Sequence, residues 1–214
     1  MRVGGFLKLS LCDWPGRPAA VIFTQGCNFR CPWCHNPSLI PFEPQGPPVP
    51  EEEVLGWLAW RKGTLGGVVV SGGEPTVQPD ILPFLARLKA LGFAVKLDTN
   101  GSNPGVVAAA LAAGLVDWVA VDFKVPARMY AMVTPDGPAA AGAVLETVRT
   151  VLLMQKGIVR TTAVPGIHDE AALEEMRREA GTDILVQPWR RPPMRIGGDA
   201  HGRTDRAVQR QKQD

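Results

Sequence analysis

Three of the chain's four cysteines lie in one short segment, where Cys27, Cys31 and Cys34 form a C-x3-C-x2-C array. Thiolates are the ligands that iron–sulfur clusters select. Three thiolates can each bind one iron of a [4Fe–4S] cluster and leave the fourth iron open to another molecule. The spacing therefore predicts a metal centre that takes part in chemistry.

Other cysteine chemistries share parts of this pattern. Residues 31–35 match the C-x-x-C-H of covalent haem attachment, and the first four of them resemble a redox dithiol. A structural zinc site would also suit the cysteines, with His35 or Cys12 as fourth ligand. Haem attachment normally requires export, and residues 1–14 contain no apolar export signal. A dithiol leaves Cys27 without a role, so the residues favour an open cluster over zinc, haem or a dithiol.

The composition is that of one soluble enzyme domain. The chain has 214 residues, of which 45% are hydrophobic and 21% charged, and its net charge is +2. No apolar run approaches the roughly 20 residues that span a bilayer, and so small a net charge gives no indication of a nucleic-acid partner. Clustered cysteines suit the reducing cytoplasm better than a disulfide framework. We therefore expect a cytoplasmic protein with neither a membrane nor a nucleic acid as partner.

The charge is concentrated at the end of the chain. Residues 190–214 carry seven Lys or Arg and three Asp, and they are polar with only scattered apolar positions. This pattern predicts a folded core, residues 1–189, followed by a basic, flexible tail, residues 190–214. A partner-docking arm is the alternative for the tail.

Short apolar runs alternate with segments of helical spacing along the core. Such runs are typical of parallel strands that are covered on both faces, and the alternation predicts an α/β fold. The expected strands are residues 19–24, 67–71, 94–98, 118–122, 159–164 and 184–187. The expected helices are residues 50–58, 80–91, 106–113, 139–155 and 170–180.

Polar or glycine-rich segments follow the first four expected strands. They are the cysteine loop and residues 71–75 (SGGEP), 98–101 (DTNG) and 122–124 (DFK). Each of the last three alone could be a turn or a surface ion pair. In parallel α/β folds, however, ligands bind at the carboxyl ends of the strands. We therefore expect these segments to form one site.

Residues 26–37 (GCNFRCPWCHNP) resemble the radical S-adenosylmethionine (SAM) superfamily, and in particular its glycyl-radical-enzyme activating branch. Residues 10–16 (SLCDWPG) are similar to the S-L-V-D-Y-P-G opening of anaerobic ribonucleotide reductase activating proteins. The resemblance runs from about residue 3 to residue 189. It implies a single-domain, partial (β/α)6 radical SAM barrel whose [4Fe–4S] cluster is held by Cys27, Cys31 and Cys34.

The resemblance also implies a reaction. The branch cleaves SAM reductively to a 5′-deoxyadenosyl radical, which takes a hydrogen from a glycine of a partner enzyme, here anaerobic ribonucleotide reductase. A flavodoxin or a ferredoxin-like protein would supply the electron. The alternatives are a pyruvate formate-lyase-type activase, a small-molecule radical SAM enzyme, and, in a different class, a non-catalytic zinc- or cluster-binding module.

Contacts to SAM follow from the same resemblance. Gly73 and Glu74 would bind the methionine amino group, and the backbone at Trp33 would contact the adenine. Cys34 and His35 belong to the same matched segment.

Asp98 and Thr99 match residues that hold a monovalent cation beside the SAM carboxylate, with help from the Asp122 backbone. Lys124 would meet a carboxylate or the ribose, and Phe123 replaces the leucine of the family's D-L-K.

Four features fall outside this match. Cys12 has no counterpart, and we expect a buried structural thiol there. Residues 187–191 lack the histidine that helps to bind SAM in the pyruvate formate-lyase type. We expect His168 to be a loop residue before a helix. Residues 38–52 contain no cysteine, which predicts a single cluster.

Overall fold

The computed structural model describes residues 1–44 and 46–190, which form seven strands and five α-helices. The strands are β1 (Val3–Ser10), β2 (Ala19–Thr24), β3 (Gly67–Gly72), β4 (Val95–Thr99), β5 (Trp118–Asp122), β6 (Gly157–Ala163) and β7 (Leu185–Pro188). The helices are α1 (Glu51–Trp60), α2 (Ile81–Ala90), α3 (Pro104–Ala112), α4 (Gly137–Leu153) and α5 (Glu170–Ala180). Strands and helices alternate from β2 onwards, which confirms the predicted α/β class.

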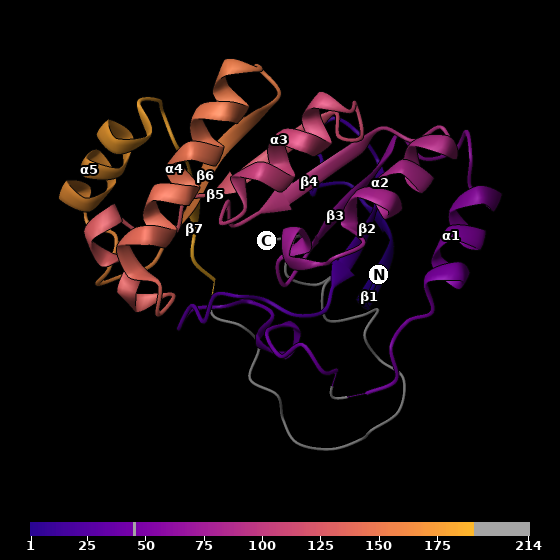
Figure 1. Cartoon of the computed structure of the whole chain (residues 1–214), viewed down its shortest axis with the longest axis horizontal. Coiled ribbons are helices and arrows are strands. Elements are labelled where there is room, and N and C mark those ends of the chain that lie inside the picture. The colour runs from indigo at the N-terminus through magenta and orange to yellow at the C-terminus, as the bar shows by residue number, and fades with distance from the viewer. Residues whose placement is uncertain (45, 191–214) are drawn as a thin grey trace.

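The seven strands form one sheet in chain order, from β1 at one edge to β7 at the other. Strands β2 to β7 pair in parallel, and β1 pairs antiparallel with β2. Figure 1 shows the five helices in an arc along one side of the sheet. Consecutive parallel strands with their helices on one side form a partial (β/α) barrel, as expected.

The two faces of the sheet differ in chemistry because successive side chains of a strand point to opposite faces. On β4, Val95 and Leu97 belong to the main apolar core that packs against the helices. Lys96 and Asp98 alternate with them and therefore point to the inner face of the barrel. Near β2 and β3 the inner face is apolar, since Val21 and Val69 pack there in a small separate cluster.

Strand β1 is not among the expected elements. Its sequence, VGGFLKLS, has two adjacent glycines after Val3, which are depleted in strands, and has no continuous apolar run. It pairs antiparallel with β2, from Val3 opposite Thr24 to Ser10 opposite Ala19, and this pairing stabilises it as an edge strand. Local sequence carries no signal for such a long-range pairing.

None of the helices within residues 1–44 and 46–190 is long and apolar enough to cross a membrane. The expected basic tail, apart from Arg190, lies outside the described residues.

Candidate functional site

The cysteine loop follows β2 and is fixed to the chain that returns beside it. The backbone N–H groups of Gly26 and Cys27 donate to carbonyls within residues 38–41, over 2.8 and 2.9 Å. The side-chain amide of Gln25 donates to two more carbonyls of that segment, over 3.0 and 2.6 Å. These bonds hold the start of the loop at the carboxyl end of β2, where a ligand site is expected.

The three cysteines of the loop are free thiols; Cys27 is buried, and Cys31 and Cys34 are partly buried. Burial raises the pKa of Cys27 to about 12 and also raises the pKa of Cys31. Without metal, Cys27 and Cys31 are therefore protonated at neutral pH, and iron would have to displace their protons. Cys31 interacts electrostatically with both of the other cysteines. The donor set fits a cluster bound by three thiolates.

Within the described residues, no three His, Cys, Asp or Glu side chains converge closely enough to hold one metal ion. The thiolates of a [4Fe–4S] cluster bind separate irons and need not converge on one point. One of the three sulfurs also accepts a hydrogen bond from the backbone: the N–H of Phe29 donates to the sulfur of Cys27 over 3.4 Å.

Glu74 is fully buried just beyond β3 and joins the ends of two strands. Its Oε1 accepts from the backbone N–H and the hydroxyl of Thr76 at 3.0 and 2.6 Å, and from the hydroxyl of Thr99 at 2.6 Å. Its Oε2 accepts from the backbone N–H of Asn100 at 2.6 Å. Burial raises the pKa of Glu74, although these bonds oppose the rise. The chain itself therefore supplies four donors to the carboxylate that was expected to meet the SAM amino group.

Gly73 lies against the cysteine loop. Its N–H donates to the carbonyl of Thr24 over 2.9 Å, and the next N–H, that of Glu74, donates to the carbonyl of Gly26 over 2.9 Å. A Cβ at position 73 would lie 2.2 Å from the carbonyl oxygen of Gly26. Glycine is needed here so that two backbones can approach, the end of β3 and the cysteine loop.

A second set of hydrogen bonds joins the cysteine loop to the end of β4. The side-chain amide of Asn100 donates to the side-chain oxygen of Asn28 over 2.9 Å, and the amide of Asn28 donates to the hydroxyl of Ser102 over 2.9 Å. Thus the structure brings together the cysteine loop, residues 73–74 and residues 98–102.

Five charged side chains gather on the inner face at the ends of β4, β5 and β6. Lys96 binds one oxygen of Asp98, and Arg160 binds the other oxygen at 3.0 Å. Arg160 also donates to Asp122 at 2.5 Å, and Lys124 donates to the second oxygen of Asp122 at 3.0 Å. Every oxygen of the two aspartates is therefore engaged by a cationic side chain.

This network sets the charges of its members. Burial alone would raise the pKa of Asp122, but the positive charges of Arg160 and Lys124 outweigh it and hold that pKa well below its usual range. Burial alone would lower the pKa of Lys124, but the Asp122 carboxylate raises it. At neutral pH, Lys124 is thus a cation that interacts electrostatically with both Cys27 and Cys31.

Lys96 and Arg160 were not among the predicted site residues. Both directly follow a valine within a short strand segment, VKLDT and GIVRTTA, respectively. A charged residue within a strand whose neighbours are buried indicates a polar interior, and that signal was available in the sequence.

Two predicted site residues turn their rings into the apolar core. Phe123 is fully buried, with its ring centroid 6.0 Å from that of Tyr130. Trp33 is also buried and meets His168 edge to face, with ring centroids 5.9 Å apart. If these residues contact SAM, they do so through the backbone. His35 is exposed, and its Nε2 lies 3.1 Å from the carbonyl oxygen of Arg190.

His168 links the ends of β5 and β6. Its Nδ1 accepts from the N–H of Val164 at 3.1 Å, so Nε2 carries the proton and donates to the carbonyl of Lys124 at 2.8 Å. The histidine precedes α5 as expected, and it also fixes the backbone at Lys124.

Cys12 is exposed, so the expectation of a buried structural thiol is wrong. Its sulfur lies 3.4 Å from the hydroxyl of Ser10 at the end of β1. The turn between β1 and β2, which the sequence did not reveal, places it at the end of β2 opposite to the cysteine loop.

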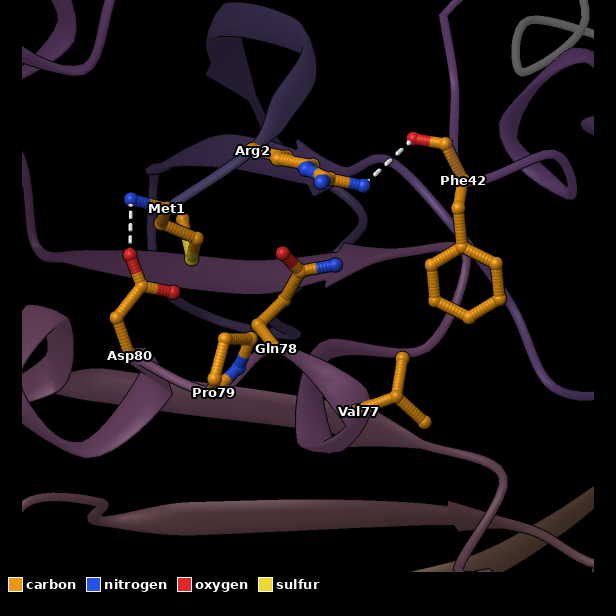
Figure 2. A pocket seen from close by; sticks show the side chains of 7 residues that line it. All are labelled: Met1, Arg2, Phe42, Val77, Gln78, Pro79 and Asp80. Carbon is orange, nitrogen blue, oxygen red and sulfur yellow. Dashed lines mark hydrogen bonds and ion pairs between the residues drawn. The ribbon is translucent and has the colours of Figure 1, made fainter.

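A separate cavity of about 460 Å³ lies beside the start of the chain (Figure 2). It is lined by Met1, Arg2, Phe42, Val77, Gln78, Pro79 and Asp80. Figure 2 shows the amino group of Met1 directed at Asp80 and the guanidinium of Arg2 directed at the Phe42 carbonyl. None of these described lining residues is a predicted cluster or SAM contact. Gln78 does support the site, since its amide donates to the Gln25 carbonyl over 2.6 Å.

The fold and the site together define a class: partial α/β barrels that carry a three-cysteine loop at the carboxyl end of their first parallel strand. The family model of the radical SAM superfamily matches residues 21–178. The chain belongs to the radical SAM superfamily.

Several known proteins are similar to this chain. A protein of Methanocaldococcus jannaschii, provisionally named a glycyl-radical enzyme activating enzyme, is 35% identical over 82% of this chain and 74% of its own length. The 7-carboxy-7-deazaguanine synthase of Methanopyrus kandleri is 31% identical over 81% of this chain and 74% of its own length. A pyruvate formate-lyase-activating enzyme of Staphylococcus aureus is 40% identical, over only 44% of this chain and 39% of its own.

Among solved structures, TYW1 with a lysine–pyruvate adduct bound has a TM-score of 0.56 at 17% identity. The match covers 80% of this chain and 65% of the TYW1 chain, so this chain spans less than two thirds of that protein. The likeness bears on the fold alone.

Proposed function

We propose that this protein activates a glycyl-radical enzyme and that its partner is an anaerobic ribonucleotide reductase. In this proposal Cys27, Cys31 and Cys34 hold one [4Fe–4S] cluster, and SAM binds at the carboxyl ends of β2 to β5. When bound, the cluster and SAM supply a one-electron cleavage that yields a 5′-deoxyadenosyl radical. The SAM contacts predicted from the sequence belong to this proposal.

The observation that carries the proposal is the hydrogen-bonded junction of three strand ends around the cysteine loop. Gly73 packs on the loop backbone, Glu74 accepts from the β4 end, and Asn100 donates back to Asn28 in the loop. These bonds would keep the cluster ligands and the SAM contacts in one fixed geometry, which lowers the entropic cost of orienting the reactants.

Lys124 would have two tasks at this junction. Its ammonium lies beside the cysteine loop and would offset part of the negative charge of a thiolate-bound cluster. It could also donate to a SAM carboxylate or the ribose, since Asp122 engages only part of its three-donor capacity. His168 fixes the backbone carbonyl of Lys124, and Asp122 holds the end of its side chain.

The proposed partner rests on two observations. The relative that is 35% identical is named for glycyl-radical enzyme activation, and residues 10–16 resemble the opening of ribonucleotide reductase activases. The 31% identity to 7-carboxy-7-deazaguanine synthase over a similar span supports a second candidate, a radical SAM enzyme with a small-molecule substrate.

The two candidates differ in the source of the hydrogen atom. Reconstituted protein and SAM are mixed under reducing conditions with an anaerobic ribonucleotide reductase whose glycines carry deuterium at Cα. Glycyl-radical activation predicts deuterium in the 5′-deoxyadenosine and a glycyl radical signal in the EPR spectrum of the reductase. Deuterium-free 5′-deoxyadenosine without that signal would contradict this partner and favour the small-molecule candidate.

A further inference from the structure

The branch that the sequence resembles places a monovalent cation beside an Asp-Thr pair, here Asp98 and Thr99. The residues around Asp98 do not fit such an ion. We propose that Lys96 and Arg160 take its place as positioning residues, so that SAM binding by this protein requires no monovalent cation. This inference rests on the proposed SAM-dependent function.

Lys96 lies two residues before Asp98 on β4, so both side chains point to the same face of the sheet. Its side chain is 2% exposed, and its ammonium is bound to Oδ1 of Asp98. A buried ammonium without a partner is strongly unfavourable. The Lys96 ammonium therefore occupies the place beside Oδ1 of Asp98 where a bound cation would lie.

Arg160 occupies the other side of the same carboxylate. From β6 it donates through Nη2 to Oδ2 of Asp98 at 3.0 Å and through Nε to Oδ1 of Asp122 at 2.5 Å. The guanidinium keeps its charge at any physiological pH. Thr99 is also engaged, since its hydroxyl donates to Glu74 and accepts from the N–H of Gly101.

The net charge of the five side chains on the inner face also argues against a bound cation. Lys96, Lys124 and Arg160 contribute three positive charges, against two negative charges from Asp98 and Asp122. A further cation would add to an excess of positive charge at a site partly shielded from water, where repulsion between like charges is strong. A carboxylate, such as that of SAM, would instead balance the excess.

A soluble ion exchanges with the medium, whereas Lys96 and Arg160 are part of the barrel. Their charge at Asp98 is present whatever the ionic composition of the solution. We therefore expect SAM affinity to be the same in potassium, sodium and tetramethylammonium chloride of equal ionic strength, within about twofold.

The test replaces the ammonium by an apolar side chain of similar length, Lys96→Met. The matched control is Lys89→Met, which removes the ion pair of Lys89 with Asp117 at 2.7 Å, away from the inner face. SAM is titrated into each cluster-reconstituted protein in the three salts, and binding is followed by the change in the EPR signal of the reduced cluster. Thallium(I) NMR on the same samples detects a saturable monovalent-cation site without SAM.

We expect Lys96→Met to bind SAM at least about tenfold more weakly in tetramethylammonium than in potassium, and to bind thallium(I) saturably. The wild type and Lys89→Met should show neither effect. If Lys96→Met does not fold, Lys96→Gln, which keeps an N–H donor but no charge, replaces it. A wild type whose SAM affinity depends on potassium, or that binds thallium(I) saturably, would overturn the proposal.

If the wild type does not respond to SAM in any salt, the proposed function fails. The thallium measurement then decides the inference alone: a site in the wild type refutes it, and a site only in the Lys96 variant supports it.

Discussion

Glu74 is a buried carboxylate whose two oxygens accept four hydrogen bonds from Thr76, Thr99 and Asn100. Replacing it by glutamine puts an amide N–H₂ where one oxygen now accepts. Since all four groups around the carboxylate are donors, at least one donor then faces another donor. The change therefore tests the carboxylate as a structural link between β3 and β4.

We expect Glu74→Gln to lower the free energy of unfolding by about 1–3 kcal/mol, as for a buried donor left without an acceptor. Urea unfolding of the metal-free protein measures it. Glu43→Gln is the control, because the Glu43 side chain is 86% exposed. Equal stability of the Glu74 variant and the parent would show that the four bonds do not hold the strand ends together.

Cys12 and the three loop cysteines should differ in iron binding. The wild type and Cys12→Ala should both saturate near about four irons per chain, as one [4Fe–4S] cluster requires. Replacing Cys31 by Ala removes a ligand and should abolish the reduced-cluster EPR signal. Iron and sulfide analysis after anaerobic reconstitution measures this. Loss of the cluster in Cys12→Ala, or a reproducible value near eight irons, would refute the three-ligand, single-cluster assignment.

At the scale of elements, the end of β3 and the cysteine loop touch through backbone alone. A methyl group at Gly73 would lie 2.2 Å from the Gly26 carbonyl oxygen, so the loop must move to admit it. We expect Gly73→Ala to destabilise the protein by about 1–3 kcal/mol, as overpacking does, and to lower the iron content.

The control is Gly56→Ala within α1, where the added methyl group meets no atom within 4 Å. Alanine favours the helix, so this variant should gain about 0.5–1 kcal/mol. Thermal unfolding and iron analysis compare the two variants. Normal iron incorporation by Gly73→Ala would mean that the contact with the loop does not position the cluster ligands.

Asp117 ties α2 to the starts of β4 and β5. It accepts from the ammonium of Lys89 at 2.9 and 2.7 Å and from the N–H of Val95 at 2.7 Å. Burial acts to raise the pKa of Asp117, but these donors outweigh it and lower that pKa. Its ionised form is therefore favoured in the folded state. The stabilisation is present above the unfolded pKa of about 3.9 and is lost as the pH falls through the lower folded value.

Asp117→Asn should accordingly lower the free energy of unfolding at pH 7 by about 1–2 kcal/mol. The difference from the parent should shrink as the pH falls below about 4, where the unfolded carboxyl is protonated. Urea unfolding of the metal-free proteins across this range measures it, with Asp183→Asn, an exposed position, as control. A difference that stays constant with pH would contradict an ionised Asp117 as the cause.

The sequence contains the signals for the parallel part of the sheet. The runs at residues 19–24 and 118–122 coincide with β2 and β5, because strands buried between helices and the inner face must be apolar. It does not reveal β1, whose pairing with β2 depends on residues distant along the chain. Helix α3 begins two residues before the expected position, because Pro104 suits the first turn of a helix.

The positions of the chemical groups could be predicted only in part. Strand-end motifs indicate that Glu74, Asp98 and Lys124 lie at one edge of the sheet. Their partners could not be foreseen, because Arg160 reaches Asp98 from a strand that begins 58 residues after β4 ends. Pairings across the inner face depend on the register of β4, β5 and β6 and on how the barrel curves.

At the scale of the whole molecule, the central claim is that the barrel and its cysteine loop cleave SAM reductively. The most direct measurement incubates the anaerobically reconstituted protein with SAM and dithionite and follows 5′-deoxyadenosine and methionine by mass spectrometry. Cys31→Ala is the matched control. The account predicts equal amounts of the two products from the wild type and none from the variant. A wild type that holds a complete cluster, with about four irons, and forms no 5′-deoxyadenosine would contradict it.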